Sequence, residues 1–161
     1  AFADAAIEAG LDAVLTVDLP PEEVAPLNDQ LHRVGMDNIF LVAPTTPDER
    51  IETIAAQASG FIYYVSLKGV TGAGNLDVAD VERQLARIRS RCDLPVAVGF
   101  GIRDAQSAAA VATVADGVVV GSALVQRVAD TLEAGGSHEA MSAAAAGLLS
   151  EIRAGIDGAA S

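Results

Sequence analysis

Glycine and small hydroxyl residues follow two apolar runs in the last third of the chain, in an arrangement that could bind an anion. The stretches are "GFGI" at residues 99–102 and "GSA" at residues 121–123. Glycine lets a backbone N–H approach an anion closely, and Ser122 stands where a helix is expected to begin, so its N–H and its hydroxyl could both bind a phosphate. Either motif alone is typical of a tight turn. Together they leave a turn and a phosphate site equally open.

A third glycine-marked stretch, "VSLKGVTGAGN" at residues 65–75, follows the apolar run "FIYYV". It is not a nucleotide-binding P-loop, because Lys68 precedes the glycines and no Gly-Lys-Ser/Thr follows. It also lacks the G-x-G-x-x-G spacing of dinucleotide sites. Its glycines instead favour a loop that changes conformation, as active-site lids do. A desolvated Lys68 could form a Schiff base, but a lysine among Gly, Ser and Thr on a loop is more simply explained as solvated.

The remaining nucleophilic or metal-binding residue types give no pattern. Cys92 is the single cysteine and cannot form an internal disulfide. His32 and His138 have no candidate partners close by in the sequence, and no His/Cys group has metal-ligand spacing. We expect a structural role for Cys92, surface positions for both histidines, and no metal site.

The elements that must position these residues are predicted by hydrophobic pattern. Five continuous apolar runs, at residues 13–17, 39–42, 61–65, 95–100 and 117–121, are typical of strands buried on both faces. Helical periodicity covers residues 22–34, 81–91, 123–132 and 137–156. Strand and helix alternate five times, which predicts a parallel sheet built from right-handed strand-helix-strand units.

Proline, acidic residues and glycine mark the expected ends of these elements. "DLPPEE" predicts a helix start with Glu22 in its first turn, and "APTTPDER" predicts another, capped by Thr46. Gly10, Gly35 and Gly60 each fall between a helical stretch and a strand, where a left-handed helix terminator is usual.

Function in a parallel sheet collects at the carboxyl ends of the strands, where Asp18 and the three glycine motifs are expected. Five strands can form a complete doubly wound domain or the last part of an eight-stranded barrel, and the pattern alone does not choose between them. In a barrel, the last two runs would be strands seven and eight, whose following loops frequently bind phosphate.

Composition limits the partners. At 161 residues the chain fits one domain, and 22 acidic against 10 basic residues give a formal charge of -12. That charge repels nucleic acid and anionic membrane surfaces. No stretch approaches 18 consecutive apolar residues, and the first residues carry acids instead of the basic segment of a signal peptide. We expect a soluble cytoplasmic protein.

Four motifs in order, "VLTVDLPPEE", "YYVSLKGVTGAGN", "PVAVGFGI" and "VVVGSALV", resemble the alpha subunit of tryptophan synthase across nearly the whole chain. The resemblance implies a TIM-barrel lyase of tryptophan biosynthesis, which cleaves indole-3-glycerol phosphate to indole and glyceraldehyde 3-phosphate. It also implies an alpha2beta2 complex with a beta subunit that receives the indole. The pyridoxal phosphate belongs to that partner, so no cofactor is expected in this subunit.

The resemblance implies roles for the two later glycine motifs. Gly99, Phe100 and Gly101 match the loop after strand seven of the family and would line the substrate phosphate and indole pocket. Gly121 and Ser122 match the loop after strand eight and would bind the phosphate.

Five further positions match the family in the earlier motifs. Tyr63 falls on a tyrosine that lies beside the substrate. Gly69, Thr71 and Gly72 fall in the lid, where the threonine orders the lid over a catalytic aspartate. Asp18 matches an acid near the interface with the beta subunit.

The family's two catalytic carboxylates match nothing in residues 1–161. By the resemblance, the chain is a single domain that holds strands four to eight of the barrel and lacks the first three. We therefore expect no catalytic residue in it, and no activity from it alone. Two alternatives stay open: another phosphosugar-binding TIM-barrel enzyme, and a complete five-stranded doubly wound binding or signalling module.

Overall fold

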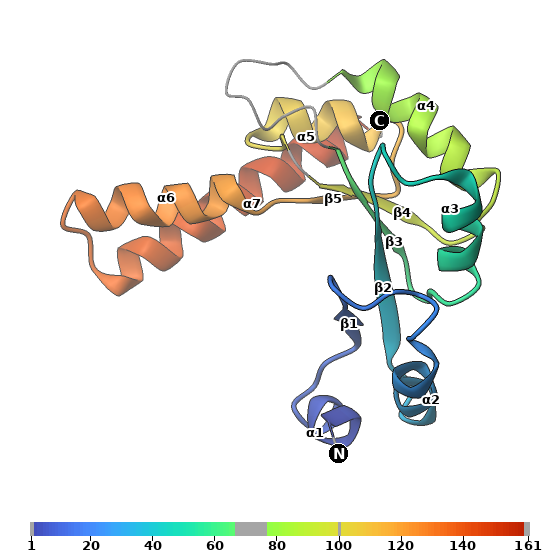
Figure 1. Cartoon of the computed structure of the whole chain (residues 1–161). Coiled ribbons are helices and arrows are strands. Elements are labelled where there is room, and N and C mark those ends of the chain that lie inside the picture. Colours follow the sequence, from blue (N-terminus) through green and yellow to red (C-terminus); the bar gives the residue numbers. More distant parts are fainter. Residues whose placement is uncertain (1, 67–76, 100, 160–161) are drawn as a thin grey trace. The chain divides into compact units, whose positions relative to one another are not determined.

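A computed structural model describes residues 2–66, 77–99 and 101–159, and contains a five-stranded sheet with its helices (Figure 1). The strands are β1 (Ala13–Leu15), β2 (Asp37–Val42), β3 (Ile62–Val65), β4 (Val96–Gly99) and β5 (Gly117–Val119). The helices are α1 (Phe2–Glu8), α2 (Ala25–Arg33), α3 (Asp48–Ala55), α4 (Val78–Arg89), α5 (Ala105–Ala112), α6 (Ser122–Glu133) and α7 (His138–Ala159).

The strands lie in the sheet in the order in which they follow one another along the chain, β1-β2-β3-β4-β5. β1 pairs with β2 in parallel, with Ala13 opposite Asp37, and β2 pairs with β3 in parallel, with Phe40 opposite Ile62. A helix follows each strand before the next begins, as right-handed parallel connections require. The predicted alternation of strand and helix is confirmed.

The chain divides into two compact units. Unit 1 comprises Ala1–Val65 and Gln84–Ala97, and unit 2 comprises Ser66–Arg83 and Val98–Ser161. Each predicted site residue within the described part of the chain belongs to one of them.

The core of unit 1 includes an aliphatic cluster between α1 and α2. Ala3 and Ala6 of α1 pack against Leu31 of α2 and Met36, and all four are buried. Ala3 and Ala6 lie three residues apart, on one face of α1. Each fully buried large side chain such as Leu31 contributes about 1.5–3 kcal/mol.

Two buried asparagines form a polar network within this core. Asn38 of β2 is 0% exposed, and its Nδ2 donates to Asn28 Oδ1 on α2 at 2.8 Å. Asn28 Nδ2 donates in turn to the backbone oxygen of Gln57 at 2.9 Å. Thr16 Oγ1 donates to Asn38 Oδ1 at 3.3 Å, and the Asn38 N–H donates to Ser59 Oγ at 3.0 Å. Both side-chain amides are thus hydrogen-bonded, which removes the penalty of burying them.

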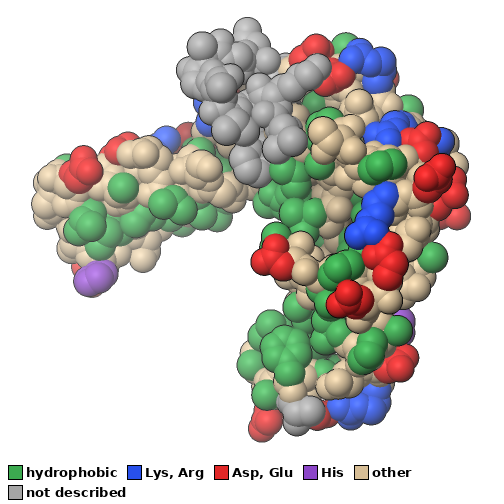
Figure 2. Space-filling view, viewed as in Figure 1, with side chains coloured by type: hydrophobic (Ala, Val, Ile, Leu, Met, Phe, Trp, Pro, Cys, Tyr) green, Lys and Arg blue, Asp and Glu red, His purple; other side chains and the backbone are tan. Residues whose placement is uncertain are grey.

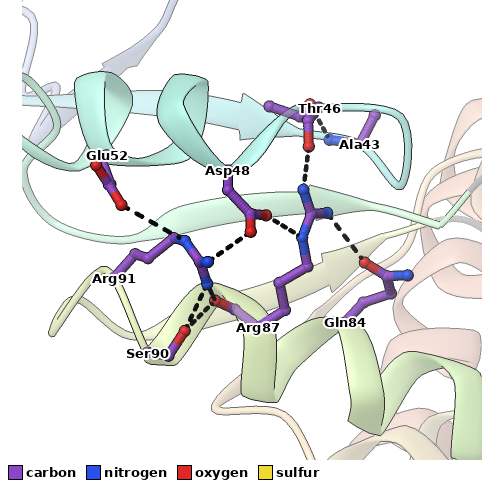
Figure 3. A network of polar contacts seen from close by, with 8 residues as sticks. All are labelled: Ala43, Thr46, Asp48, Glu52, Gln84, Arg87, Ser90 and Arg91. Atoms are coloured by element: carbon purple, nitrogen blue, oxygen red, sulfur yellow. Dashed lines mark hydrogen bonds and ion pairs between the residues drawn. The ribbon is translucent and has the colours of Figure 1, made fainter.

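A charged network on the surface of unit 1 joins α3 to the end of α4 (Figure 3). Asp48, in the first turn of α3, accepts hydrogen bonds from Arg87 Nε and Arg91 Nη2. Arg87 also donates to the backbone oxygen of Thr46, and Arg91 Nε lies 3.6 Å from Glu52 Oε1. The negative charge of Asp48 is favourable at the N-terminus of a helix, and Arg87 and Arg91 neutralise that charge.

Three helices make up most of unit 2. The longest, α7, packs along both α5 and α6. Its buried face carries Leu148 and Ile152, and Gly155 extends that face by one more turn. A β carbon at Gly155 would lie 2.5 Å from the backbone oxygen of Ala105, so only glycine fits where α7 crosses the start of α5.

Two predicted helix starts were wrong in detail. The helix expected from residue 22 begins at Ala25, because a turn closed by the Glu23 N–H on the Pro20 oxygen, at 2.9 Å, precedes it. Thr46 does not cap α3. Its hydroxyl accepts from the Ala43 N–H at 3.0 Å, and Pro47 occupies the N-cap position.

The expectation that all strands are buried on both faces was also wrong. β2 is mostly buried, but β3 alternates, with Ile62 and Tyr64 buried and Tyr63 and Val65 half-buried. The short strands β1 and β5 have no buried residue. Each of them ends the sheet order and therefore has a neighbouring strand on one side only. The left-handed glycines were predicted correctly: Gly10, Gly35 and Gly60 have φ of 85°, 73° and 73°.

Candidate functional site

The loop after β4 begins where the sequence predicts it. Gly99 is the last residue of β4 and is buried, and its carbonyl accepts from the Ser66 N–H at 3.1 Å. Gly101 is exposed with φ of 80°, a conformation that favours glycine. Ile102 is buried directly after it and anchors the loop. Phe100 lies outside the described residues.

The helix after this loop supplies its own N-terminal partner. Asp104 Oδ1 accepts from the Ser107 N–H at 2.8 Å, and Ser107 Oγ accepts from the Asp104 N–H at 3.2 Å, which forms a capping box. Hydrogen bonds from the Ser107 side chain and backbone hold the pKa of the Asp104 carboxyl below its ordinary value. The N-terminus of α5 therefore already holds a negative charge, which disfavours a second anion there.

The helix after β5 is different, because no side chain of the described residues caps it. Gly121 occupies the N-cap position, and its carbonyl accepts from the Leu124 and Val125 N–H groups at 2.9 and 3.1 Å. Ser122 is the first helical residue, and both Gly121 and Ser122 are exposed. Among the described residues, a β carbon at Gly121 would meet nothing within 4 Å.

The two loops leave neighbouring strands of the sheet. β4 and β5 are adjacent in the strand order, so the loop that contains Gly101 and the one that contains Gly121 leave the sheet at the same edge. Of these two helix starts, only that of α6 offers uncapped N–H groups and the positive end of a helix dipole to an anion. The sequence predicted both glycine motifs as phosphate sites without distinguishing them. Asp104, three residues before Ser107, has the spacing of a capping box and could have shown that the start of α5 is already capped.

Tyr63 lies on β3 in unit 1 and is half-buried. Burial raises the pKa of its phenol above the ordinary value of 10. A phenol is neutral near pH 7 even without this shift, so the Tyr63 hydroxyl can donate a hydrogen bond. The predicted lid residues Gly69, Thr71 and Gly72, and Lys68 beside them, lie outside the described residues.

Asp18 lines a cavity of about 260 Å³ in unit 1. The walls are residues 16–21, Phe40 and Leu41 of β2, Thr46, and Arg50 and Ile54 of α3. The Asp18 side chain is exposed and makes no hydrogen bond or ion pair to the part of the chain that the structure describes. Arg50 at the same cavity donates to Glu22 Oε1.

The other reactive residue types have no site around them. Cys92 is buried with a free thiol, and His32 and His138 are both exposed. The described residues contain no group of three or more His, Cys, Asp or Glu that could hold a metal ion. None of the helices within residues 2–66, 77–99 and 101–159 has the length and apolar character needed to span a bilayer.

Parallel strands joined by helices, with glycine-marked loops at the carboxyl ends, place the chain in the TIM-barrel class. The family model described as tryptophan synthase alpha chain matches residues 1–154. The chain belongs to the tryptophan synthase alpha chain family.

Sequence relatives support the assignment. The alpha chain of Alkalilimnicola ehrlichii is 54% identical over 157 residues, which cover 98% of this chain and 56% of that protein. The alpha chain of Burkholderia mallei is 53% identical over 160 residues, which cover 99% of this chain and 57% of that protein. The chain thus spans about half the length of the curated relatives it matches.

Solved structures agree with the sequence relatives. The tryptophan synthase alpha subunit of Legionella pneumophila matches with a TM-score of 0.83 at 39% identity, over 98% of this chain and 56% of that one. A tryptophan synthase structure from M. tuberculosis matches with a TM-score of 0.78 at 31% identity, over 96% of this chain and 54% of that one. The predicted partial TIM barrel is confirmed, and the family match leaves no place for the doubly wound module.

Proposed function

We propose that this chain is part of a tryptophan synthase alpha subunit, the lyase that cleaves indole-3-glycerol phosphate to indole and glyceraldehyde 3-phosphate. The family match and the order of its motifs support this reaction. A phosphate-bearing substrate also suits the uncapped start of α6, which is the single observation in the structure that carries the proposal.

In the proposed complex the start of α6 binds the phosphate. The N–H groups of the first helical turn and the Ser122 hydroxyl donate to phosphate oxygens, and the helix dipole adds to the attraction. Gly121 leaves room for the anion because it lacks a side chain. The Gly99–Gly101 loop borders the same edge of the sheet, and Phe100 contacts the indole ring.

Carbon-carbon cleavage needs an acid to protonate the indole ring carbon and a base to remove a proton as the bond breaks. We assign neither role to residues 1–161. Tyr63, neutral near pH 7, lies beside the substrate and orients it, and Thr71 orders the lid that covers it. The two carboxylates come from outside these residues, so the 161-residue chain by itself does not turn over substrate.

We further propose that the subunit works in an alpha2beta2 complex with a beta subunit that holds pyridoxal phosphate, and that the alpha subunit has no cofactor of its own. The solved tryptophan synthase structures among the matches support such a partner. Membership in this biosynthetic family favours the cytoplasm as its location. Asp18 lies on the surface that meets the beta subunit.

Charge placed at the start of α6 tests the phosphate site. In the full alpha subunit containing these residues, Ser122→Asp should weaken the binding of glycerol 3-phosphate by at least about tenfold, because a carboxylate would face the phosphate. Isothermal titration calorimetry measures the affinity.

Ser137→Asp is the matched control. Ser137 precedes α7 in the same unit, and its hydroxyl accepts from the Ala140 N–H at 3.2 Å, a role that aspartate can take over. We expect glycerol 3-phosphate to bind this variant as it binds the wild type. Equal affinity of wild type, Ser122→Asp and Gly101→Asp would remove the phosphate assignment.

A further inference from the structure

The cavity beside Asp18 in unit 1 has one polar side chain that no described residue pairs with. Four polar side chains line it: Thr16, Asp18, Thr46 and Arg50. Thr16 Oγ1 donates to Asn38 Oδ1 at 3.3 Å, Thr46 Oγ1 accepts from the Ala43 N–H at 3.0 Å, and Arg50 pairs with Glu22. Among the described residues, only the carboxylate of Asp18 remains without a partner.

The charge around the cavity is therefore negative. Glu22 neutralises Arg50, which leaves the charge of Asp18 uncompensated, and Glu23 is a further exposed acid in the turn that forms one wall. The chain as a whole carries a formal charge of -12. A cationic group is favoured here over an anionic or neutral one.

The size and the lining residues of the cavity indicate which kind of cationic ligand it fits. Pockets for drug-sized ligands measure roughly 300–1,000 Å³, and the cavity of about 260 Å³ is smaller. Pro20, Pro21, Phe40 and Ile54 provide apolar walls. A cleft with several apolar walls and one unpaired acid suits one long side chain of another protein, with an alkyl stem that packs on the walls and a charged end that reaches the acid.

We propose that this cavity receives a lysine or arginine side chain of the partner chain. The alkyl stem lies against the prolines and Phe40, and the ammonium or guanidinium group pairs with the Asp18 carboxylate. The inference rests on the proposed function, which gives the chain a partner, and it names the chemistry that the partner presents at this point of the interface.

The test compares two exposed acids of the same unit. Asp29 lies on α2, is exposed, and like Asp18 makes no ion pair to the described residues, so its substitution changes the net charge by the same amount at a different place. Asp18→Asn, Asp18→Lys, Asp29→Asn and Asp29→Lys are made in the full alpha subunit. The affinity of each for the beta subunit is measured by calorimetry at low and at high salt.

We expect Asp18→Asn to weaken association about tenfold and Asp18→Lys about a hundredfold, because the first removes an ion pair and the second adds repulsion. Both Asp29 variants should bind within about twofold of the wild type. The affinity of Asp18→Asn should also depend less on salt, because one ion pair fewer is screened.

Asp18 variants that bind like their Asp29 counterparts would overturn the inference and leave the partner itself in place. A wild-type subunit that does not bind the beta subunit would instead overturn the proposed function, and the inference with it. Circular dichroism and glycerol 3-phosphate affinity show whether each variant is folded, since neither readout depends on the cavity.

Discussion

Gly60, between α3 and β3, has a positive φ in a crowded environment. Its φ is 73°, and a β carbon would lie 2.9 Å from both Asp37 Oδ2 and Ile39 Cδ1. Ile39 is buried and has little room to move. Gly10 has a similar φ of 85°, but a β carbon there would meet nothing within 4 Å. Substitution of Gly10 therefore measures the cost of a positive φ alone, and substitution of Gly60 measures that cost together with the cost of steric overlap.

We predict that Gly60→Ala destabilises the alpha subunit more than Gly10→Ala does. Both variants lose about 1–2 kcal/mol because alanine disfavours a positive φ, and Gly60→Ala loses about 1–3 kcal/mol more through overpacking. Urea denaturation of the two variants and the wild type measures the free energies of unfolding. A difference between the variants below about 0.5 kcal/mol would show that Asp37 and Ile39 move aside freely.

Single residues also show where sequence reasoning succeeded. The positions of Gly99, Gly101, Gly121 and Ser122 were predictable because strand ends follow from the hydrophobic pattern, and the structure places these residues at or just after β4 and β5; their binding role stays a prediction. The sequence did not reveal that the Asp18 carboxylate pairs with no other described residue. Whether it pairs depends on which neighbouring groups are already engaged, and contacts such as Thr16 to Asn38, which join residues 22 positions apart, do not follow from local pattern.

At the scale of elements, two of the three glycines of α7 have opposite surroundings. Gly155 lies where α7 crosses α5, and a β carbon there would be 2.5 Å from the Ala105 oxygen and 2.9 Å from its Cβ. Gly147, two turns earlier, is exposed and has nothing within 4 Å of that position. Both glycines are inside a helix, where alanine is intrinsically better by about 1 kcal/mol.

We predict effects of opposite sign in α7. Gly147→Ala should stabilise the subunit by about 0.5–1 kcal/mol, since it improves helix propensity without a contact. Gly155→Ala should destabilise it by about 1–3 kcal/mol, because the added methyl group meets the backbone of α5, which cannot rotate away. Thermal unfolding followed by circular dichroism shows whether each variant is more or less stable than the wild type. A stabilising Gly155→Ala would mean that α5 and α7 do not pack as described.

The types of the elements were predictable and their ends less so. Hydrophobic periodicity identified helices such as α6 because one face of each helix is apolar. The helix predicted from residue 22 begins three residues later, because Pro20 to Glu23 form a turn. Proline fits both a first helical turn and a β-turn, so the sequence alone does not separate them.

At the scale of the molecule, each unit exposes large apolar side chains. Unit 1 does so along α1 and β1, at Phe2, Ile7, Leu11, Leu15 and Val17. Unit 2 does so along the hairpin of α6 and α7, at Val125, Leu132 and Leu149. Figure 2 shows hydrophobic side chains on the surface of this hairpin. Val125 and Leu132 are seven positions apart and lie on one face of α6, no side chain of which is buried in the described structure. Clustered exposed apolar side chains mark surfaces that other protein covers.

We predict that the purified 161-residue chain associates with itself at micromolar concentration. Exposed apolar faces in both units and two sheet-end strands, β1 and β5, favour intermolecular contacts. Val125→Glu combined with Leu132→Glu should reduce the associated fraction in sedimentation velocity. Gln126→Glu combined with Arg127→Glu, on the same helix, adds acid outside the apolar face and should change it less. A monomer with a sharp cooperative melt would contradict this prediction.

The buried asparagine pair has a consequence for how the chain finds its fold. Asn38 lies opposite Val14 in the pairing of β1 with β2, and its side chain reaches Asn28 and Thr16 together only in that register. A slip of one residue would turn the amide to the other face of the sheet, separating it from these partners. Each unmet amide hydrogen bond in a buried place costs about 1–3 kcal/mol, whereas a slipped aliphatic side chain can still find apolar contacts. Because most of the surrounding core is aliphatic, we expect the asparagine pair to disfavour misaligned pairing of the strands during folding.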